Sequence, residues 1–272
     1  MKVALISDIH SNLEALQATL EAISTQEVDY IVCLGDIVGY NANPTECIEL
    51  LRQRNVTCVA GNHDRAVTGQ ITTKGFDYTA KRAVAWTRNC LSNEAVEYLA
   101  ELPVELSIPN ELVAVHGALH PKTGRETVRL DSDARRRQSF EALLTHHSKA
   151  RVCAFGHTHQ LGIFELHNGV VQMLTGDQVS LRNDAWYLVN PGSVGQPRTA
   201  DRRSTYLILN SFQKKITAHY VDYADAIPFA KTRNAGLLPF WIHLPQPIRK
   251  SLRFLPTPIR SAIKWAIELL RL

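Results

Sequence analysis

The chain has 272 residues, of which 45% are hydrophobic and 21% charged, and this composition excludes a globally disordered protein. The formal net charge of +4 is unevenly distributed, because residues 226–272 contain eight Lys and Arg and one Glu, a charge of +7, which leaves −3 for residues 1–225. The mildly acidic body argues against nucleic acid as a partner.

The cysteines and the N-terminus indicate a cellular compartment. The five cysteines form no Cys-x-x-Cys pair, and Cys33, Cys58 and Cys153 lie inside apolar runs, where we expect buried thiols. Such thiols are typical of a reducing compartment. The sequence has no secretory leader pattern and no uncharged apolar run long enough to span a membrane. We therefore expect a cytoplasmic protein.

The first sixty residues repeat one pattern of strand, polar turn and helix. Strands are predicted at residues 2–7, 30–34 and 57–60, which are short apolar runs rich in β-branched residues. Helices are predicted at residues 13–23 and 45–54, the first with apolar residues spaced by three and four positions. Such units pair their strands in parallel, so we expect their polar ends along one edge of one sheet.

The rest of the body combines helices with short strands. Residues 65–102 show the apolar faces of two helices, the second capped by Ser92. A strand at 111–116, a loop at 118–133, a helix at 132–150 and a strand at 151–155 follow. The last strands are predicted at residues 161–166, 170–174, 186–189, 204–209 and 215–221. This order predicts an α/β fold (α+β-like), a four-layer α-β-β-α sandwich of two mixed sheets.

The pattern changes after residue 225, so we predict a body over 1–225 and a basic extension over 226–272. Prolines interrupt residues 237–258, and a helix is predicted over 257–272, with a proline in its first turn. This amphipathic helix either docks on the body or a second copy of the chain, or lies on an anionic membrane with Trp241 and Trp265 as interfacial anchors.

Polar residues at the strand ends suggest a metal site. They are Asp8, His10, Asp36, Asn62, His63, His116, His157 and His159. Carboxylate, amide and imidazole groups suit a divalent transition metal, and the lack of thiolates argues against a Cys-rich structural zinc site. The set is larger than one ion needs, so we expect two ions.

These residues lie in five motifs: Asp-x-His, Gly-Asp-x-x-Gly, Gly-Asn-His-Asp, His-Gly and Gly-His-Thr-His, in this order within residues 1–222. The series resembles the calcineurin-like metallophosphoesterase family. The run Asn-Pro-Gly-Ser-Val-Gly-Gln-Pro-Arg resembles the family's prokaryotic branch of phosphodiesterases and nucleotide pyrophosphatases. The resemblance implies the two-sheet sandwich and hydrolysis of a phosphodiester or nucleotide pyrophosphate bond in a small-molecule phosphoester or nucleotide.

The resemblance also implies roles for the residues of the motifs. The first metal would be held by Asp8, His10, Asp36 and His159. The second would be held by Asp36, Asn62, His116 and His157. We expect manganese at both positions, with iron, zinc, cobalt or nickel as alternatives. A water activated by the metals would attack phosphorus in line, and His63 would assist the leaving group.

Several residues near the motifs have two interpretations. Arg198 either binds a substrate phosphate or forms a structural ion pair, and Asn12 either contacts phosphate or caps the first helix. Arg125 and Arg129 are further candidates for contact with a polyphosphate. Protein phosphatases of the family carry an Asp three residues after the bridging acid, where this chain has Gly39, and this difference argues against a protein substrate.

Two other functions are alternatives. One is a non-catalytic interaction scaffold on the same fold, as in the retromer subunit that resembles these enzymes. That scaffold has lost the catalytic histidine and ligand positions, whereas this chain keeps His63 and all seven ligand candidates. The other is a nuclease of the family, which the acidic body and the lack of an aromatic and basic groove disfavour.

Overall fold

Two six-stranded sheets form the centre of the molecule in the computed structural model, which describes residues 1–108, 112–147, 149–238, 259, 262–263 and 266. The first sheet contains β1 (Lys2–Ile6), β2 (Tyr30–Cys33), β3 (Thr57–Cys58), β9 (Gln178–Ser180), β11 (Ser204–Asn210) and β12 (Lys215–Val221). The second contains β4 (Glu105–Ile108), β5 (Leu112–Val115), β6 (Val152–Ala154), β7 (Leu161–His167), β8 (Val170–Leu174) and β10 (Trp186–Pro191).

Both sheets are mixed. The strand order is β3-β2-β1-β11-β12-β9 in the first and β4-β5-β6-β10-β7-β8 in the second. The strands β1, β2 and β3 are parallel, as are β5, β6 and β10, and the other pairs are antiparallel. The predicted parallel pairing of the first three strands is therefore confirmed.

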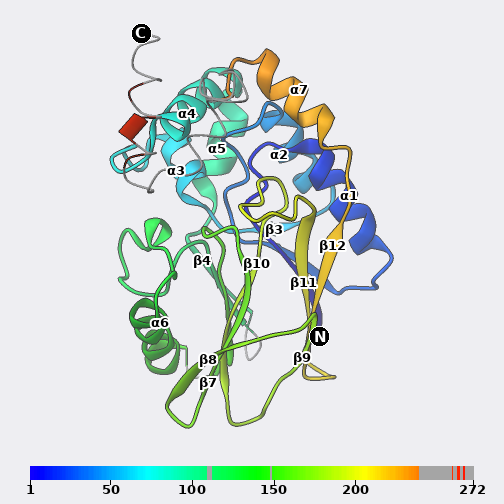
Figure 1. Cartoon of the computed structure of the whole chain (residues 1–272), viewed down its shortest axis with the longest axis vertical. Coiled ribbons are helices and arrows are strands. Elements are labelled where there is room, and N and C mark those ends of the chain that lie inside the picture. The colour runs from blue at the N-terminus through cyan, green and yellow to red at the C-terminus, as the bar shows by residue number, and fades with distance from the viewer. Residues whose placement is uncertain (109–111, 148, 239–258, 260–261, 264–265, 267–272) are drawn as a thin grey trace.

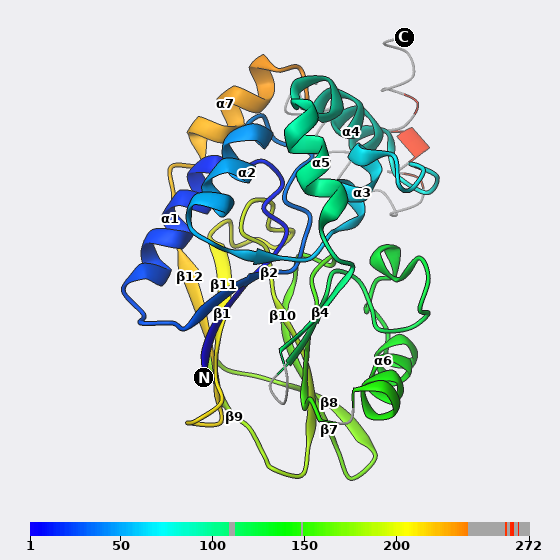
Figure 2. The ribbon, with the colours of Figure 1, turned by 180° about the vertical axis from the view of Figure 1, so that it is seen from behind.

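Helices cover the outer faces of both sheets (Figures 1 and 2). On the side of the first sheet lie α1 (Leu13–Ser24), α2 (Pro44–Gln53), α3 (Asn62–Thr68), α4 (Tyr78–Cys90), α5 (Asn93–Glu101) and α7 (Ala226–Asn234). The helix α6 (Asp133–His146) covers the second sheet. The predicted four-layer sandwich of two mixed sheets is therefore confirmed.

The alternation of side chains in β1 shows why this strand is apolar throughout. Ala4 and Ile6 face the helices, whereas Val3 and Leu5 face the second sheet, and all four are fully buried. A third cluster of apolar side chains fills the space between the second sheet and α6. Strands buried on both faces need continuous apolar runs, as the sequence indicated.

The structure adds elements that the sequence did not predict. The strands β4 and β9, the helix α3 and a 3₁₀ turn at Arg125–Thr127 were missed. The first residues of the predicted extension form α7, which packs on α1, and Thr232 Oγ1 donates a hydrogen bond to Asn41 Oδ1 over 3.0 Å.

The predicted C-terminal helix lies mostly outside the described residues, and so do Trp241 and Trp265. Within it, Ile259, Ala262, Ile263 and Ala266 are described and helical. Among all the residues with described positions, no helix combines the length and the apolar character needed to cross a membrane.

Phe140 on α6 tests the contribution of the third apolar cluster. Its side chain is 1% exposed, so Phe140→Ala should lower the free energy of unfolding by about 3–5 kcal/mol. Phe212 is 85% exposed, and Phe212→Ala should change it by less than about 0.5 kcal/mol. Urea denaturation measures both values, and equal effects of the two variants would contradict the assignment of α6 to the core.

Candidate metal centre

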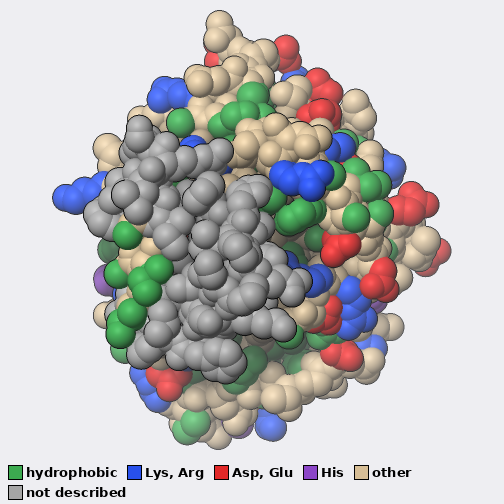
Figure 3. Space-filling model, turned by 45° about the horizontal axis from the view of Figure 1, so that its top comes forward, with side chains coloured by type: hydrophobic (Ala, Val, Ile, Leu, Met, Phe, Trp, Pro, Cys, Tyr) green, Lys and Arg blue, Asp and Glu red, His purple; other side chains and the backbone are tan. Residues whose placement is uncertain are grey.

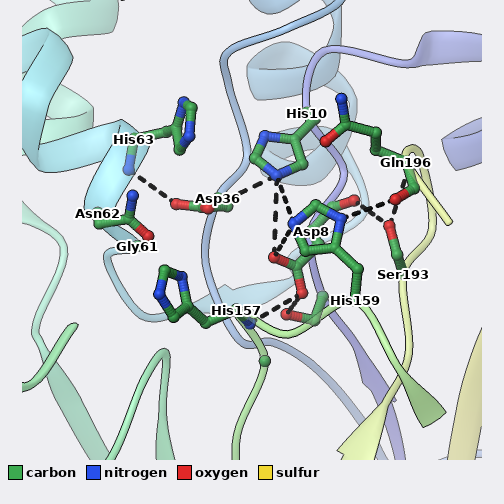
Figure 4. A network of polar contacts seen from close by, with 12 residues as sticks. Asp8, His10, Asp36, Gly61, Asn62, His63, His157, His159, Ser193 and Gln196 are labelled. Atoms are coloured by element: carbon green, nitrogen blue, oxygen red, sulfur yellow. Dashed lines mark hydrogen bonds and ion pairs between the residues drawn. The ribbon is translucent and has the colours of Figure 1, made fainter. Parts of the chain in front are cut away.

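All eight predicted site residues meet at one end of the sandwich (Figure 4). They lie after the C-terminal ends of β1, β2, β5 and β6 and in the first turn of α3, which follows β3. In open sheets with parallel strands, ligand sites form at this edge. Seven of the eight residues are buried, and His157 is half-buried.

The first group of metal-ligand candidates contains Asp8, His10 and His159. The Nε2 atom of His159 lies 3.2 Å from Asp8 Oδ1 and 3.2 Å from His10 Nε2. Asp8 Oδ1 is buried and accepts no hydrogen bond from the described residues. A buried carboxylate oxygen without a donor is costly unless a cation pairs with it, so this group fits a metal ion.

The second group contains Asp36, His116 and His157. The Nε2 atom of His116 lies 3.2 Å from Asp36 Oδ2 and 3.0 Å from the side-chain oxygen of Asn62. Carboxylate, imidazole and amide oxygen therefore converge at a second point, as expected for a ligand set of mixed oxygen and nitrogen donors.

Asp36 lies between the two groups. Its Oδ2 atom is 3.5 Å from His10 Nε2 on one side and 3.2 Å from His116 Nε2 on the other. Its Oδ1 atom accepts a hydrogen bond of 2.8 Å from the backbone N–H of His63. The carboxylate is thus oriented by α3 and shared by both groups of ligand candidates.

Backbone carbonyls orient three of the histidines. The Nδ1 atoms of His10, His116 and His159 lie 3.1, 2.7 and 2.7 Å from the carbonyl oxygens of Val38, Leu34 and Gln196. A carbonyl only accepts hydrogen bonds, so each Nδ1 carries a proton, and in the neutral ring Nε2 presents a lone pair to the cluster. The sequence did not reveal these acceptors.

The electrostatics of the cluster favour neutral imidazoles at three positions. Burial lowers the pKa of His10 and His157 well below the usual value, and it also lowers the pKa of His159. Burial opposes protonation of His116 as well, but the adjacent Asp36 carboxylate raises its pKa to about 9. Neutral imidazoles bind metals, and a cation in the second group would take over the role of the His116 proton.

The loops that carry the ligand candidates have unusual backbone conformations. The φ angles of Asp8, His10, Asp36, His157 and His159 are 54°, 49°, 53°, 64° and 58°. Left-handed conformations are uncommon for residues other than glycine, and each costs about 1–3 kcal/mol. Hydrogen bonds between the loops maintain them, such as His10 N–H to Asp36 O at 2.9 Å.

The His63 ring lies beside the ligand candidates, with a ring nitrogen within 4.8 Å of ligand atoms of His10 and Asp36. Its ring centroid lies 4.9 Å from that of His10, 4.7 Å from that of Tyr40 and 5.0 Å from that of Phe76. Its buried Nδ1 atom has no hydrogen-bond partner among the described residues, and burial lowers its pKa. The side chain is therefore a neutral imidazole with an unused nitrogen in an aromatic enclosure.

Gly39 explains why no orienting acid accompanies His63. A Cβ atom at this position would lie 2.5 Å from His63 Nδ1, and the φ angle of Gly39 is +95°. A side chain here would displace the ring. The imidazole thus occupies the space that an aspartate would need.

Asp64, which the sequence analysis did not single out, connects two of the site loops. Its Oδ1 atom accepts the N–H of Val38 at 3.1 Å and its Oδ2 atom accepts the N–H of Gly61 at 2.9 Å. Burial and the charge of Asp36 raise its pKa to about 7. The last residue of Gly-Asn-His-Asp therefore fixes the segments that carry Asp36 and Asn62.

The remaining candidates take different positions. Asn12 caps α1, because its Oδ1 atom accepts the N–H of Ala15 at 3.2 Å, and this contact favours the capping interpretation. Arg125 forms an ion pair of 2.6 Å with Glu105. Burial lowers the pKa of His159 and His157, and the charges of Arg198 and Arg129, respectively, add to this lowering through space.

The fold and the cluster of buried carboxylates and histidines define a metallophosphoesterase. Residues 1–214 match the model of the calcineurin-like phosphoesterase superfamily domain, and the chain belongs to this family. It is a metal-dependent phosphohydrolase. This result confirms the family resemblance of the five motifs.

Three relatives illustrate the similarity. An uncharacterized protein of Methanocaldococcus jannaschii is 34% identical over 251 residues, which cover 88% of this chain and 95% of the relative. A metallophosphoesterase structure from Sphaerobacter thermophilus has 33% identity and a TM-score of 0.73 over 88% of this chain and 95% of that chain. A Pyrococcus horikoshii hypothetical protein shares the fold, with 20% identity and a TM-score of 0.70 over 87% and 94%.

A substitution at Gly39 tests the placement of His63. Gly39→Ala should reduce metal-dependent hydrolysis of bis(p-nitrophenyl) phosphate by about 100-fold, because the added Cβ atom would clash with the His63 ring and displace it. Gly75 is the matched control, since its φ angle is also positive but a Cβ atom there meets nothing within 4 Å. Both variants carry left-handed strain of about 1–2 kcal/mol, so equal activities would contradict this placement.

Proposed function

We propose that the chain hydrolyses a phosphodiester or nucleotide pyrophosphate bond in a small molecule with two divalent metal ions. The observation that carries the proposal is the position of Asp36 Oδ2, 3.5 Å from His10 Nε2 and 3.2 Å from His116 Nε2. One carboxylate shared by two ligand groups is the arrangement that a dinuclear site requires.

The two groups divide the ligand candidates. The first ion would be held by Asp8, His10, Asp36 and His159. The second would be held by Asp36, Asn62, His116 and His157. Bound divalent ions supply charge neutralisation at the phosphoryl group and an activated water for in-line attack. Manganese suits these hard oxygen and borderline nitrogen ligands, and iron, zinc, cobalt and nickel are alternatives.

His63 is the residue of this chain that we assign to the leaving group. It is neutral, it has an unused ring nitrogen, and its backbone N–H holds Asp36 Oδ1. A positioned imidazole can donate a proton to, or hydrogen-bond with, the departing oxygen. We also assign the Arg198 guanidinium to binding of a phosphoryl oxygen, because its charge acts on His159 through space.

The structure of the loop after β2 supports a small substrate. The side chains of Tyr40 and Phe76 lie around His63. The His63 ring fills the space beside Gly39, so position 39 cannot hold an acid that would orient the imidazole. A complete set of seven ligand candidates also favours an enzyme over a non-catalytic scaffold, because a scaffold has no need for buried carboxylates and strained loops.

Hydrolysis of bis(p-nitrophenyl) phosphate tests the proposal. Protein stripped of metal should be inactive, Mn²⁺ should restore turnover, and calorimetric titration should show two ions per chain. His63→Ala should lower kcat by about 100-fold or more while two ions still bind, as expected for loss of a general acid. Asp36→Asn should weaken binding of both ions.

The outcomes separate the alternatives. Binding of a single ion would overturn the dinuclear assignment. Two bound ions without turnover of any phosphodiester or nucleotide pyrophosphate, with each of the five metals, would favour the scaffold. Full activity of His63→Ala would remove this residue from the mechanism.

A further inference from the structure

A groove lies between α7 and the loop of residues 193–198, next to the metal centre. It has a volume of about 470 Å³. Its walls are formed by Asn12 and Asn41 in the loops after β1 and β2, by residues 195–197, by Tyr223 and Asp225 after β12, and by the helix α7. None of the preceding functional assignments uses this groove.

Gln196 connects the groove to the metal centre. Its side chain lines the groove, and its backbone carbonyl oxygen lies 2.7 Å from Nδ1 of the ligand candidate His159. Figure 4 shows its side chain near His10, and its buried Oε1 atom has no hydrogen-bond partner among the described residues. Asn41, also in the groove wall, donates a hydrogen bond of 2.8 Å to the backbone oxygen of His10, so the groove adjoins two ligand candidates.

The polar groups of the groove divide into two kinds. Asn12 and Asn41 are already satisfied, since they bond to the backbone of Ala15, Gly195 and His10 and to Thr232. The side chains of Arg202 and Asp225 also line the groove, and they have no ion pair or hydrogen bond with another described side chain. Donors and an acceptor are thus available to a ligand.

Two aromatic side chains also line the groove. Tyr223 and Phe229 both line the groove, and Phe229 is 47% exposed although it is a large apolar side chain on a helix. Flat rings combined with free hydrogen-bonding groups match the faces and edges of a nucleobase. Figure 3, in which the top of the molecule is turned forward, shows hydrophobic, basic and acidic side chains intermixed around the grey residues.

We infer that this groove binds the nucleoside of a nucleotidyl substrate, whose phosphoryl group lies at the metal centre. The base would stack on Phe229 or Tyr223, and Arg202 and Asp225 would contact its edge or the sugar hydroxyls. The inference rests on the proposed function and specifies its substrate class as a nucleoside phosphodiester or a nucleotide pyrophosphate.

Two substrates with the same leaving group test the inference. Thymidine 5′-monophosphate p-nitrophenyl ester carries a nucleoside, and methyl p-nitrophenyl phosphate carries a methyl group instead. Manganese-loaded wild-type protein should show a kcat/KM at least about 10-fold higher for the thymidine ester, the effect of one stacked base. Thymidine 5′-monophosphate should competitively inhibit hydrolysis of the methyl ester.

Phe229→Ala should lower the ratio of kcat/KM for the two esters by about 10-fold, since it removes the exposed ring. Phe212→Ala is the matched control, because Phe212 is an exposed phenylalanine that is absent from the walls of the groove, and it should leave the ratio unchanged. The partial exposure of Phe229 makes a folded variant the expected product.

The possible failures are distinguishable. No hydrolysis of either ester by the wild type would overturn the proposed function. Hydrolysis of both esters with equal kcat/KM, or a ratio that Phe229→Ala does not change, would overturn the nucleoside groove and leave the proposed function intact.

Discussion

The buried carboxylate of Asp36 is the constraint on which the rest of the site depends. It is 1% exposed, it shares the neighbour His10 with Asp8, and it forms no ion pair with a Lys or Arg among the described residues. Burying such charges without compensation is costly. Neutral histidines, whose Nε2 lone pairs face the cluster, do not compensate the negative charge of the carboxylates. The cluster therefore needs cations or a protonated imidazole such as His116.

The fold meets this constraint by holding the loops that carry the ligand candidates in fixed conformations. Parallel strands place the ligand candidates at one edge, left-handed residues turn the side chains inward, and Asp64 holds Val38 and Gly61. The strain of these loops opposes folding, whereas the three apolar clusters favour it. The domain can therefore maintain a strained and charged centre because apolar side chains fill the other layers of the sandwich.

The sequence predicted the elements whose local pattern and burial agree. The strands β1 and β2 are continuous apolar runs because both their faces are buried. The helix α1 has a single apolar face because only that face is buried. The sequence missed β9, which has three residues and a mostly exposed pattern, and α7, a helix of nine residues for which no prediction was made. The motifs placed the ligand candidates together, but the carbonyls of Leu34, Val38 and Gln196 are backbone groups and leave no trace in residue identity.

The position of α7 bears on how a family metal centre could take a particular substrate class. The ligand candidates leave little freedom for change, because all but His157 are buried and because His10, His116 and His159 each contact a backbone carbonyl. Residues 226–234 are outside the segment that matches the family model, yet they supply one wall of the groove next to His159. In the proposed nucleoside groove, this helix would select the group attached to phosphorus without changing the chemistry, since Phe229 and Asp225 line the groove and are not among the ligand candidates.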